Sequence, residues 1–202
     1  MKYPVLIDFM QKFCQNAVCV EVGVFRGDQS EAILQNTNCK KLYCVDPWLQ
    51  FDNDVYPDGI NSIPQSEFNK MYKETVDRLA HFGDRQGVLR MTSVDAAATF
   101  LDNSIDFVFI DGNHEYKAVM ADFRAWYPKL KKGGYFCGDD VFSTNLAEYD
   151  SDKNVTLIHT RKPDGTPDAW GKYGVFTALL DFQKEQPYQF QIAGNHFFSV
   201  KG

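Results

Sequence analysis

Side chains that could bind a cation or move a proton stand where two apolar runs end. The run IDFVFI is followed at once by Asp111 and then by His114, and the run YFCG is followed by Asp139 and Asp140. Carboxylates suit Mg²⁺ and Ca²⁺, which prefer oxygen ligands. A histidine, with an ordinary pKa of about 6.5, can accept a proton at neutral pH. These residues indicate either a divalent-metal site or acids that cap the segments after them, and spacing alone leaves both alternatives open.

A second set of residues surrounds a glycine-containing turn. In VEVGVFRGDQS, Gly23 and Gly27 separate an apolar run from a helix-like stretch, and Glu21 precedes both. Glycine lets a backbone turn sharply and approach a ligand, while free amides at a helix start point toward it. The spacing is G-x-x-x-G and not the dinucleotide fingerprint G-x-G-x-x-G, which disfavours pyrophosphate binding. A plain strand-to-helix turn is the alternative.

Asp46 ends the next apolar run, KLYCVD, and stands about twenty residues after Gly27. The carboxyl ends of neighbouring parallel strands lie at one edge of a sheet, so this acid is expected beside the glycine turn. There it could accept hydrogen bonds from both hydroxyls of a ribose. The turn and the acid together favour a nucleoside-containing ligand, whereas an acid before Pro47 could by itself mark only a turn.

The elements that must position these residues follow from the hydrophobic pattern. The pattern predicts strands at 18–24, 41–46, 88–92, 105–111 and 135–140, helices at 28–35, 64–81, 94–101, 116–130 and 175–184, and a closing hairpin at 189–194 and 196–201. Gly133 and Gly134 are expected to end the 116–130 helix. Residues 47–63 and 161–174 are expected to be loops that cover an acceptor pocket. Alternating strands and helices predict an α/β fold with a seven-stranded, mostly parallel sheet, a C-terminal antiparallel hairpin and helices on both faces, in a single domain over 1–202.

Composition narrows the class of protein. The net charge is −6, and short basic runs do not form the clustered face that binds nucleic acid. No apolar run is long enough to cross a bilayer, and the first residues lack the pattern of a secretory signal, so we expect no membrane association and a cytoplasmic location. Five cysteines without paired metal-type spacing are expected to be reduced core residues. The expected partner is a small-molecule acceptor, with a homodimer as a possibility.

The residues EVGVFRG, Asp46 and the run FIDGNHEY together resemble class I S-adenosylmethionine-dependent methyltransferases, which have a Rossmann-like fold. Within that superfamily, the segment FIDGNHEYKAVMADFRAWYPKLKKGGYFCGDD, paired with the glycine turn, is similar to the macrocin O-methyltransferase-like group. The resemblance runs from about residue 15 to the end of the chain and implies S-adenosyl-L-methionine as the cofactor. The cofactor-binding residues that it implies are Glu21, Gly23, Val24, Phe25, Gly27, Asp46, Pro47, Trp48, Ser93, Val94 and Asp111.

The resemblance also assigns roles within this set. The Glu21–Gly27 segment would lie along the methionine part of the cofactor, Asp46 would bind the ribose, and Ser93 would supply a polar contact near the adenine. The acids Asp111, Asp139 and Asp140 resemble a magnesium site.

The proton acceptor is harder to assign. Several relatives carry an acid at the position of Asn113, and an asparagine cannot accept a proton at neutral pH. His114 is therefore the predicted general base, with a simple turn residue as the alternative, and Asp111 is the second predicted catalytic residue.

The sequence thus predicts divalent-metal-assisted methyl transfer from S-adenosylmethionine to a hydroxyl of a small molecule such as a sugar, a phenol or a natural product. One alternative is a nicotinamide-dependent oxidoreductase, against which the missing middle glycine and the acids count. Another is a non-catalytic cofactor-binding module, to which Asn113 gives some weight. A metal-dependent hydrolase is weaker, because the acids and His114 lack a recognised hydrolase spacing.

Overall fold

The computed structural model describes residues 3–52, 59–142, 149–161 and 167–202. Its helices are α1 (Pro4–Phe13), α2 (Asp28–Asn36), α3 (Gln65–Leu79), α4 (Ser93–Ala98), α5 (Tyr116–Trp126) and α6 (Val175–Glu185), with 3₁₀ turns η1 (Gly59–Ser62), η2 (Ala80–Arg85) and η3 (Tyr127–Lys129). Its strands are β1 (Val18–Val22), β2 (Lys41–Asp46), β3 (Gln86–Arg90), β4 (Ile105–Ile110), β5 (Leu130–Gly138), β6 (Val155–Arg161), β7 (Pro167–Tyr173), β8 (Phe190–Ala193) and β9 (His196–Val200).

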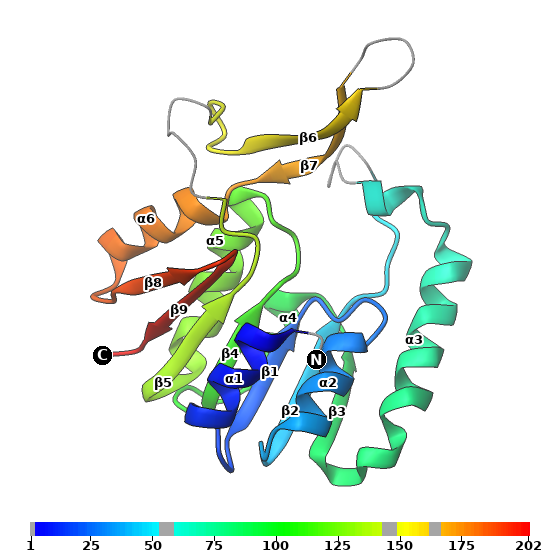
Figure 1. Cartoon of the computed structure of the whole chain (residues 1–202), viewed down its shortest axis with the longest axis vertical. Coiled ribbons are helices and arrows are strands. Elements are labelled where there is room, and N and C mark those ends of the chain that lie inside the picture. Colours follow the sequence, from blue (N-terminus) through cyan, green and yellow to red (C-terminus); the bar gives the residue numbers. More distant parts are fainter. Residues whose placement is uncertain (1–2, 53–58, 143–148, 162–166) are drawn as a thin grey trace.

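Seven strands form one twisted sheet in the order β3-β2-β1-β4-β5-β9-β8 (Figure 1). The pairs from β3 across to β5 are parallel, whereas β9 is antiparallel to both β5 and β8. This arrangement confirms the predicted sheet and its C-terminal hairpin. The chain runs outward in opposite directions from β1 and β4, and the crevice at the carboxyl ends of two such strands is where open α/β sheets bind ligands.

Helices cover both faces of the sheet, as predicted, because the central strands are apolar on both sides. Along β1, Cys19 packs with the α1, α2 and α3 side chains, whereas Val20 and Val22 pack with those of α4, α5 and α6. Along β4, Phe107 and the next residue alternate in the same way. The two cores therefore fix which residues at the strand ends can face the crevice.

The segment after β5 departs from the prediction. Residues 161–174 were expected to form a loop, but β6 and β7 pair as an antiparallel, two-stranded sheet of their own. This hairpin extends above the carboxyl ends of the parallel strands (Figure 1). The predicted 161–174 loop is therefore wrong for the described part of that segment. The sequence Pro167–Tyr173 contains Pro, Asp and Gly, which are rare in strands, so only its pairing with β6 makes it extended.

Two smaller differences concern helices. The predicted 116–130 helix ends at Trp126, and a 3₁₀ turn leads into β5, so Gly133 and Gly134 lie inside a strand and do not end the helix. Gly133 adopts a φ of 77° and donates its N–H to the carbonyl of Lys201. The helix α1 was not predicted, although its buried Leu6, Ile7 and Met10 follow helical spacing. None of the described helices combines the length and apolar character needed to cross a membrane.

Candidate cofactor and metal site

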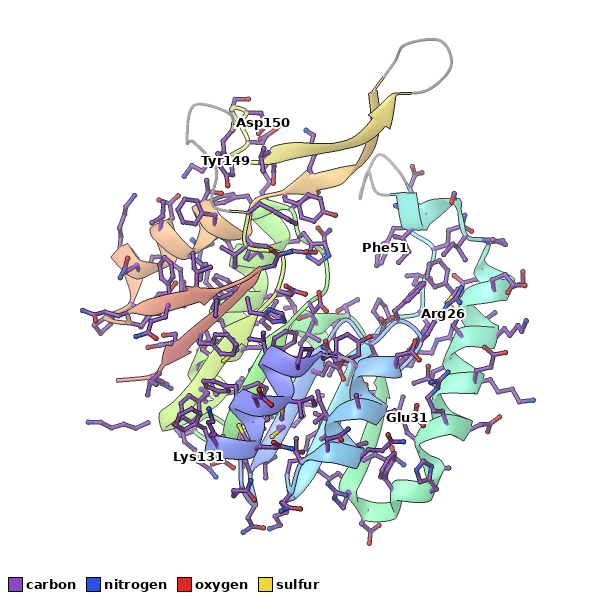
Figure 2. The ribbon with its side chains drawn as sticks, in the orientation of Figure 1. Arg26, Glu31, Phe51, Lys131, Tyr149 and Asp150 are labelled. Atoms are coloured by element: carbon purple, nitrogen blue, oxygen red, sulfur yellow. The ribbon has the colours of Figure 1, made fainter. Side chains whose placement is uncertain are left out.

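A cavity of about 700 Å³ opens at the carboxyl ends of β1, β2 and β4. Its size is typical of pockets for small ligands and cofactors. One end is lined by predicted cofactor residues, namely Gly23, Phe25, Asp46, Pro47, Ser93 and Val94. The other end is lined by Asp111, Asn113 and His114, and the apolar lining includes Phe51, which Figure 2 shows on the α3 side below the β6–β7 hairpin.

The glycine turn brings backbone close to the cavity. Gly23 has a φ of 89°, and a Cβ placed there would lie 1.9 Å from the carbonyl oxygen of Asp111. Gly27 has a φ of 75° and is the residue before α2, where a Cβ would lie 2.8 Å from a methyl group of Thr75. Both positions therefore require glycine, and the turn packs directly against the end of β4.

Asp46 organises the same end of the cavity. One carboxylate oxygen accepts hydrogen bonds from the N–H groups of Val24 (3.0 Å) and Phe25 (2.9 Å), and the other accepts from the N–H of Trp48 (2.7 Å). Burial raises the pKa of Asp46, while these three backbone donors oppose that rise. A carboxylate can accept about four hydrogen bonds, so Asp46 can hold the turn in place and still accept from a ribose hydroxyl.

Four predicted cofactor residues lie behind the cavity wall and not on it: Glu21, Val24, Gly27 and Trp48. Trp48 is fully buried, and its indole N–H donates to the carbonyl of Phe25 at 2.7 Å. Glu21 is also fully buried and accepts from the side chains of Gln29 (3.0 Å) and Ser30. Burial raises the pKa of Glu21 to about 7. These residues support the turn from beneath, which a strand-end motif alone does not reveal.

The acidic end of the cavity brings together three potential ligands. One ligand atom from each of Asp111, His114 and Asp140 can be chosen so that all lie within 4.8 Å of one another. The Nε2 of His114 lies 3.2 Å from a carboxylate oxygen of Asp140. Burial raises the pKa of Asp111 well above its ordinary value, and the charges of Asp139, Asp140 and Glu21 raise it further.

Asp139, the third predicted metal ligand, is outside this cluster of described residues. Its Oδ1 accepts the N–H of Asp140 at 2.7 Å and lies 3.9 Å from Nδ1 of His196. The backbone of Asp140 is left-handed, with a φ of 58°, so the chain turns between the two acids. The turn directs one of two adjacent carboxylates toward His114, which spacing could not indicate.

The segment that carries His114 is braced by the last residue of β7 and by the residue after it. The imidazole of His114 stacks on the ring of Tyr173, with centroids 5.3 Å apart and planes 11° apart. The backbone carbonyl of His114 accepts the N–H of Gly174. The side-chain oxygen of Asn113 accepts the N–H of Glu115 at 2.9 Å. Asn113 therefore builds the turn that presents His114. Sequence reasoning did not identify Tyr173 or Gly174 as supports, because their contact with His114 is long-range.

One functional candidate was missed entirely. Asp122 of α5 lines the cavity although it is only 5% exposed, and burial raises its pKa to about 7 while the Ser93 hydroxyl lowers it. The signal was present in the sequence, since Asp122 falls on the apolar stripe of α5 with Val119, Phe123 and Trp126. An acid on a core-facing stripe is rarely buried without a reason.

The fold and this site define the class: a Rossmann-like class I methyltransferase fold. A family model described as a methyltransferase domain matches residues 20–141, which is more than half of the chain, and the chain therefore belongs to this family. Among curated proteins, an uncharacterized protein of Acanthamoeba polyphaga mimivirus is 34% identical over 124 residues, covering 60% of this chain and 50% of that protein. The chain thus spans about half the length of that relative.

Solved structures share the fold at low sequence identity. A candidate caffeoyl-CoA O-methyltransferase from Staphylococcus aureus has a TM-score of 0.63 and 16% identity, over 100% of this chain and 85% of that one. A candidate methyltransferase from Streptococcus mutans, in complex with SAH, has a TM-score of 0.58 and 12% identity, over 100% of this chain and 99% of that one. At these identities the likeness supports the fold, and the family match counts against the oxidoreductase alternative.

Proposed function

We propose that this chain transfers the methyl group of S-adenosylmethionine to a hydroxyl of a small molecule, with a divalent cation bound beside the acceptor. The observation that carries the proposal is a single cavity with a glycine turn and Asp46 at one end, and with Asp111 and His114, which cluster with Asp140, at the other. A donor and an acceptor held in one cavity react far faster than free molecules, because their encounter and orientation are fixed in advance.

The cofactor would lie along the strand ends from Gly23 to Val94. Its methionine part would pass the glycine turn, its ribose would bind Asp46, and its adenine would reach the segment after β3. Phe25, Leu49 and Val94 are exposed large apolar side chains that line this path, at 37%, 45% and 47% exposure. Exposed apolar side chains gathered around a pocket are typical of surfaces that a ligand covers.

The residues at the acidic end suit a divalent cation. Mg²⁺ commonly binds through one or two carboxylates plus water, which Asp111 and Asp140 can supply. The raised pKa of the buried Asp111 has burial and neighbouring acids as its causes, and a cation would offset both. When bound, such an ion lowers the pKa of an acceptor hydroxyl and orients its oxygen.

His114 is the proposed general base. The acceptor oxygen would attack the methyl carbon as the bond from that carbon to sulfur breaks, S-adenosylhomocysteine would leave as a neutral thioether, and His114 would take the hydroxyl proton. Stacking on Tyr173 and the contact with Asp140 fix the imidazole, which limits its motion before proton transfer. The acceptor class is a sugar, phenol or natural-product hydroxyl, in keeping with the resemblance to the macrocin O-methyltransferase-like group.

Calorimetry with S-adenosylhomocysteine tests the cofactor half of the proposal. We expect saturable binding by the full chain with a Kd of about 100 μM or tighter, and binding of NADH to be absent at the same concentrations. Lack of S-adenosylhomocysteine binding at millimolar ligand, or preferential binding of NADH, would contradict it.

Metal titration separates the two roles open to His114. We expect Mg²⁺ binding to weaken at least tenfold in Asp140→Asn and to stay within about threefold of wild type in His114→Gln, because two carboxylates and water suffice as ligands. His114→Gln should still bind S-adenosylhomocysteine. A loss of Mg²⁺ affinity in His114→Gln equal to that in Asp140→Asn would make His114 a ligand and exclude it as the base.

A further inference from the structure

Asp122 stands at the end of the cavity that lies between α5 and the segment after β3. Ser93 and Val94 line one side of this end, and Ala118, Ala121 and Asp122 line the other. The α5 side of this end therefore consists of two small apolar side chains and one carboxyl group. Asp122 supplies the acidic side chain at this end of the cavity, beside the hydroxyl of Ser93.

The protein itself gives Asp122 little compensation for its burial. The influences on its pKa are burial, which raises it to about 7, and the Ser93 hydroxyl, which lowers it; no lysine or arginine of the described residues contributes. Ser93 accepts the indole N–H of Trp126 at 2.9 Å, which leaves its O–H to donate to Asp122 as the one described protein group that lowers this pKa. A buried carboxyl group that faces a cavity with so few partners is placed to bind a ligand donor.

We propose that Asp122 accepts a hydrogen bond from the 6-amino group of the cofactor's adenine and so makes the site selective for adenosine over inosine. This inference rests on the proposed cofactor site, and it moves the polar adenine contact from Ser93 to Asp122. The 6-amino group of adenine is a hydrogen-bond donor, which a carboxyl oxygen can accept. Hypoxanthine, the base of inosine, has a carbonyl oxygen at the same position, and above about pH 8, where Asp122 is ionised, two acceptors would then face each other without water.

The experiment compares S-adenosylhomocysteine with S-inosylhomocysteine by calorimetry on the full chain. Wild type should bind the adenosine compound roughly 10- to 100-fold more tightly, as expected for one charge-assisted hydrogen bond in a buried site. In Asp122→Asn the side-chain amide can accept from the 6-amino group or donate to a 6-carbonyl, so the ratio should fall to within about threefold. Asp95→Asn is the matched control, because Asp95 is exposed on α4 and does not line the cavity; its ratio should equal that of wild type.

The outcomes separate this inference from the function on which it rests. Equal binding of the two compounds by wild type would overturn the role of Asp122 alone, and binding of neither would overturn the proposed function as well. A purely structural role would weaken both compounds equally in Asp122→Asn and keep their ratio, which also overturns it. If Asp122→Asn does not fold, the wild-type complex with S-adenosylhomocysteine decides: a carboxyl oxygen within 3.5 Å of the 6-amino nitrogen, about the limit of a hydrogen bond, supports the proposal, and a longer distance overturns it.

Discussion

The carboxylates at the two ends of the cavity, Asp46 and Asp111, have different surroundings. Asp46, at the cofactor end, accepts three backbone N–H groups, which oppose the effect of burial on its pKa. At the acidic end, burial and three other acids raise the pKa of Asp111, and among the described residues no group lowers it. The first carboxylate is part of the scaffold that shapes the turn. The charged form of the second carboxylate is unfavourable in free energy, and a bound cation would relieve this.

The residues with positive φ differ between the two ends of the cavity in a similar way. Phe25, Trp48 and Asp140 are non-glycine residues with positive φ, and they follow β1, β2 and β5 around the cavity. Such residues cost about 1–3 kcal/mol each and persist where the surrounding structure fixes them. At the cofactor end, hydrogen bonds from Phe25 and Trp48 to Asp46 offset this cost. At the acidic end, the turn at Asp140 serves mainly to direct its carboxylate.

The largest change in stability is expected at Gly23, which contacts the backbone of Asp111. Gly23→Ala would place a methyl group 1.9 Å from the carbonyl oxygen of Asp111, at a φ of 89°, and backbone on both sides prevents relief. We expect the free energy of unfolding to fall by more than about 4 kcal/mol, measured by urea denaturation. Gly194→Ala is the control: its φ is 65°, no described atom lies within 4 Å, and about 1 kcal/mol should be lost. Equal losses in the two variants would mean that the turn and β4 are not tightly packed.

The strands that carry the site could be predicted from the sequence, because runs such as IDFVFI are apolar on both faces and end in polar residues at a shared edge. The sequence could not predict which of these polar residues face the cavity. Glu21 and Trp48 are buried beneath the turn, and Asp139 is outside the cluster that contains His114, since these outcomes depend on contacts with α2, Phe25 and the left-handed Asp140. The β6–β7 hairpin was missed for a related reason: its extended form comes from pairing and not from local preference.

The next largest effect is the change in the free energy of unfolding with pH that Glu21 causes. Its pKa is about 7 in the fold and 4.5 ordinarily, so the folded protein retains a proton that the unfolded chain has released between these values. The contribution of Glu21 to the free energy of unfolding should therefore be complete below about pH 4.5, fall as pH rises and be lost above about pH 7, a change of about 3 kcal/mol.

The variant Glu21→Gln should remove that part of the decline, because a side-chain amide does not titrate. Thermal unfolding from pH 5 to pH 8 checks this by the difference between variant and wild type, which separates Glu21 from Asp111 and Asp122. Glu67→Gln, on the exposed side of α3, should keep the wild-type profile. A wild-type profile in Glu21→Gln would show that the buried carboxyl is not the source.

Asparagine substitutions of Asp111 and Asp46 should change the free energy of unfolding in opposite directions. Asp111→Asn removes a carboxyl group whose charged form burial and neighbouring acids disfavour, and we expect the free energy of unfolding to rise in chelator at pH 8, with loss of any stabilisation by Mg²⁺. Asp46→Asn makes a side-chain NH₂ face a backbone N–H, and we expect a loss of about 2 kcal/mol. Urea denaturation of both variants measures the signs. Two losses of similar size would remove the distinction between the ends.

The smallest effect is expected at Asn113, where the resemblance to relatives with an acid left a doubt about the mechanism. Its side-chain oxygen accepts the N–H of Glu115 at 2.9 Å, so Asn113→Ala should cost about 1 kcal/mol, whereas Asn113→Asp keeps an acceptor and should cost less than about 0.5 kcal/mol. Because this role is to form the turn that presents His114, turnover in Asn113→Asp should stay within about threefold of wild type. A hundredfold loss of turnover in a folded Asn113→Ala, with His114→Gln nearly unaffected, would reverse the assignment and place the chemistry on Asn113.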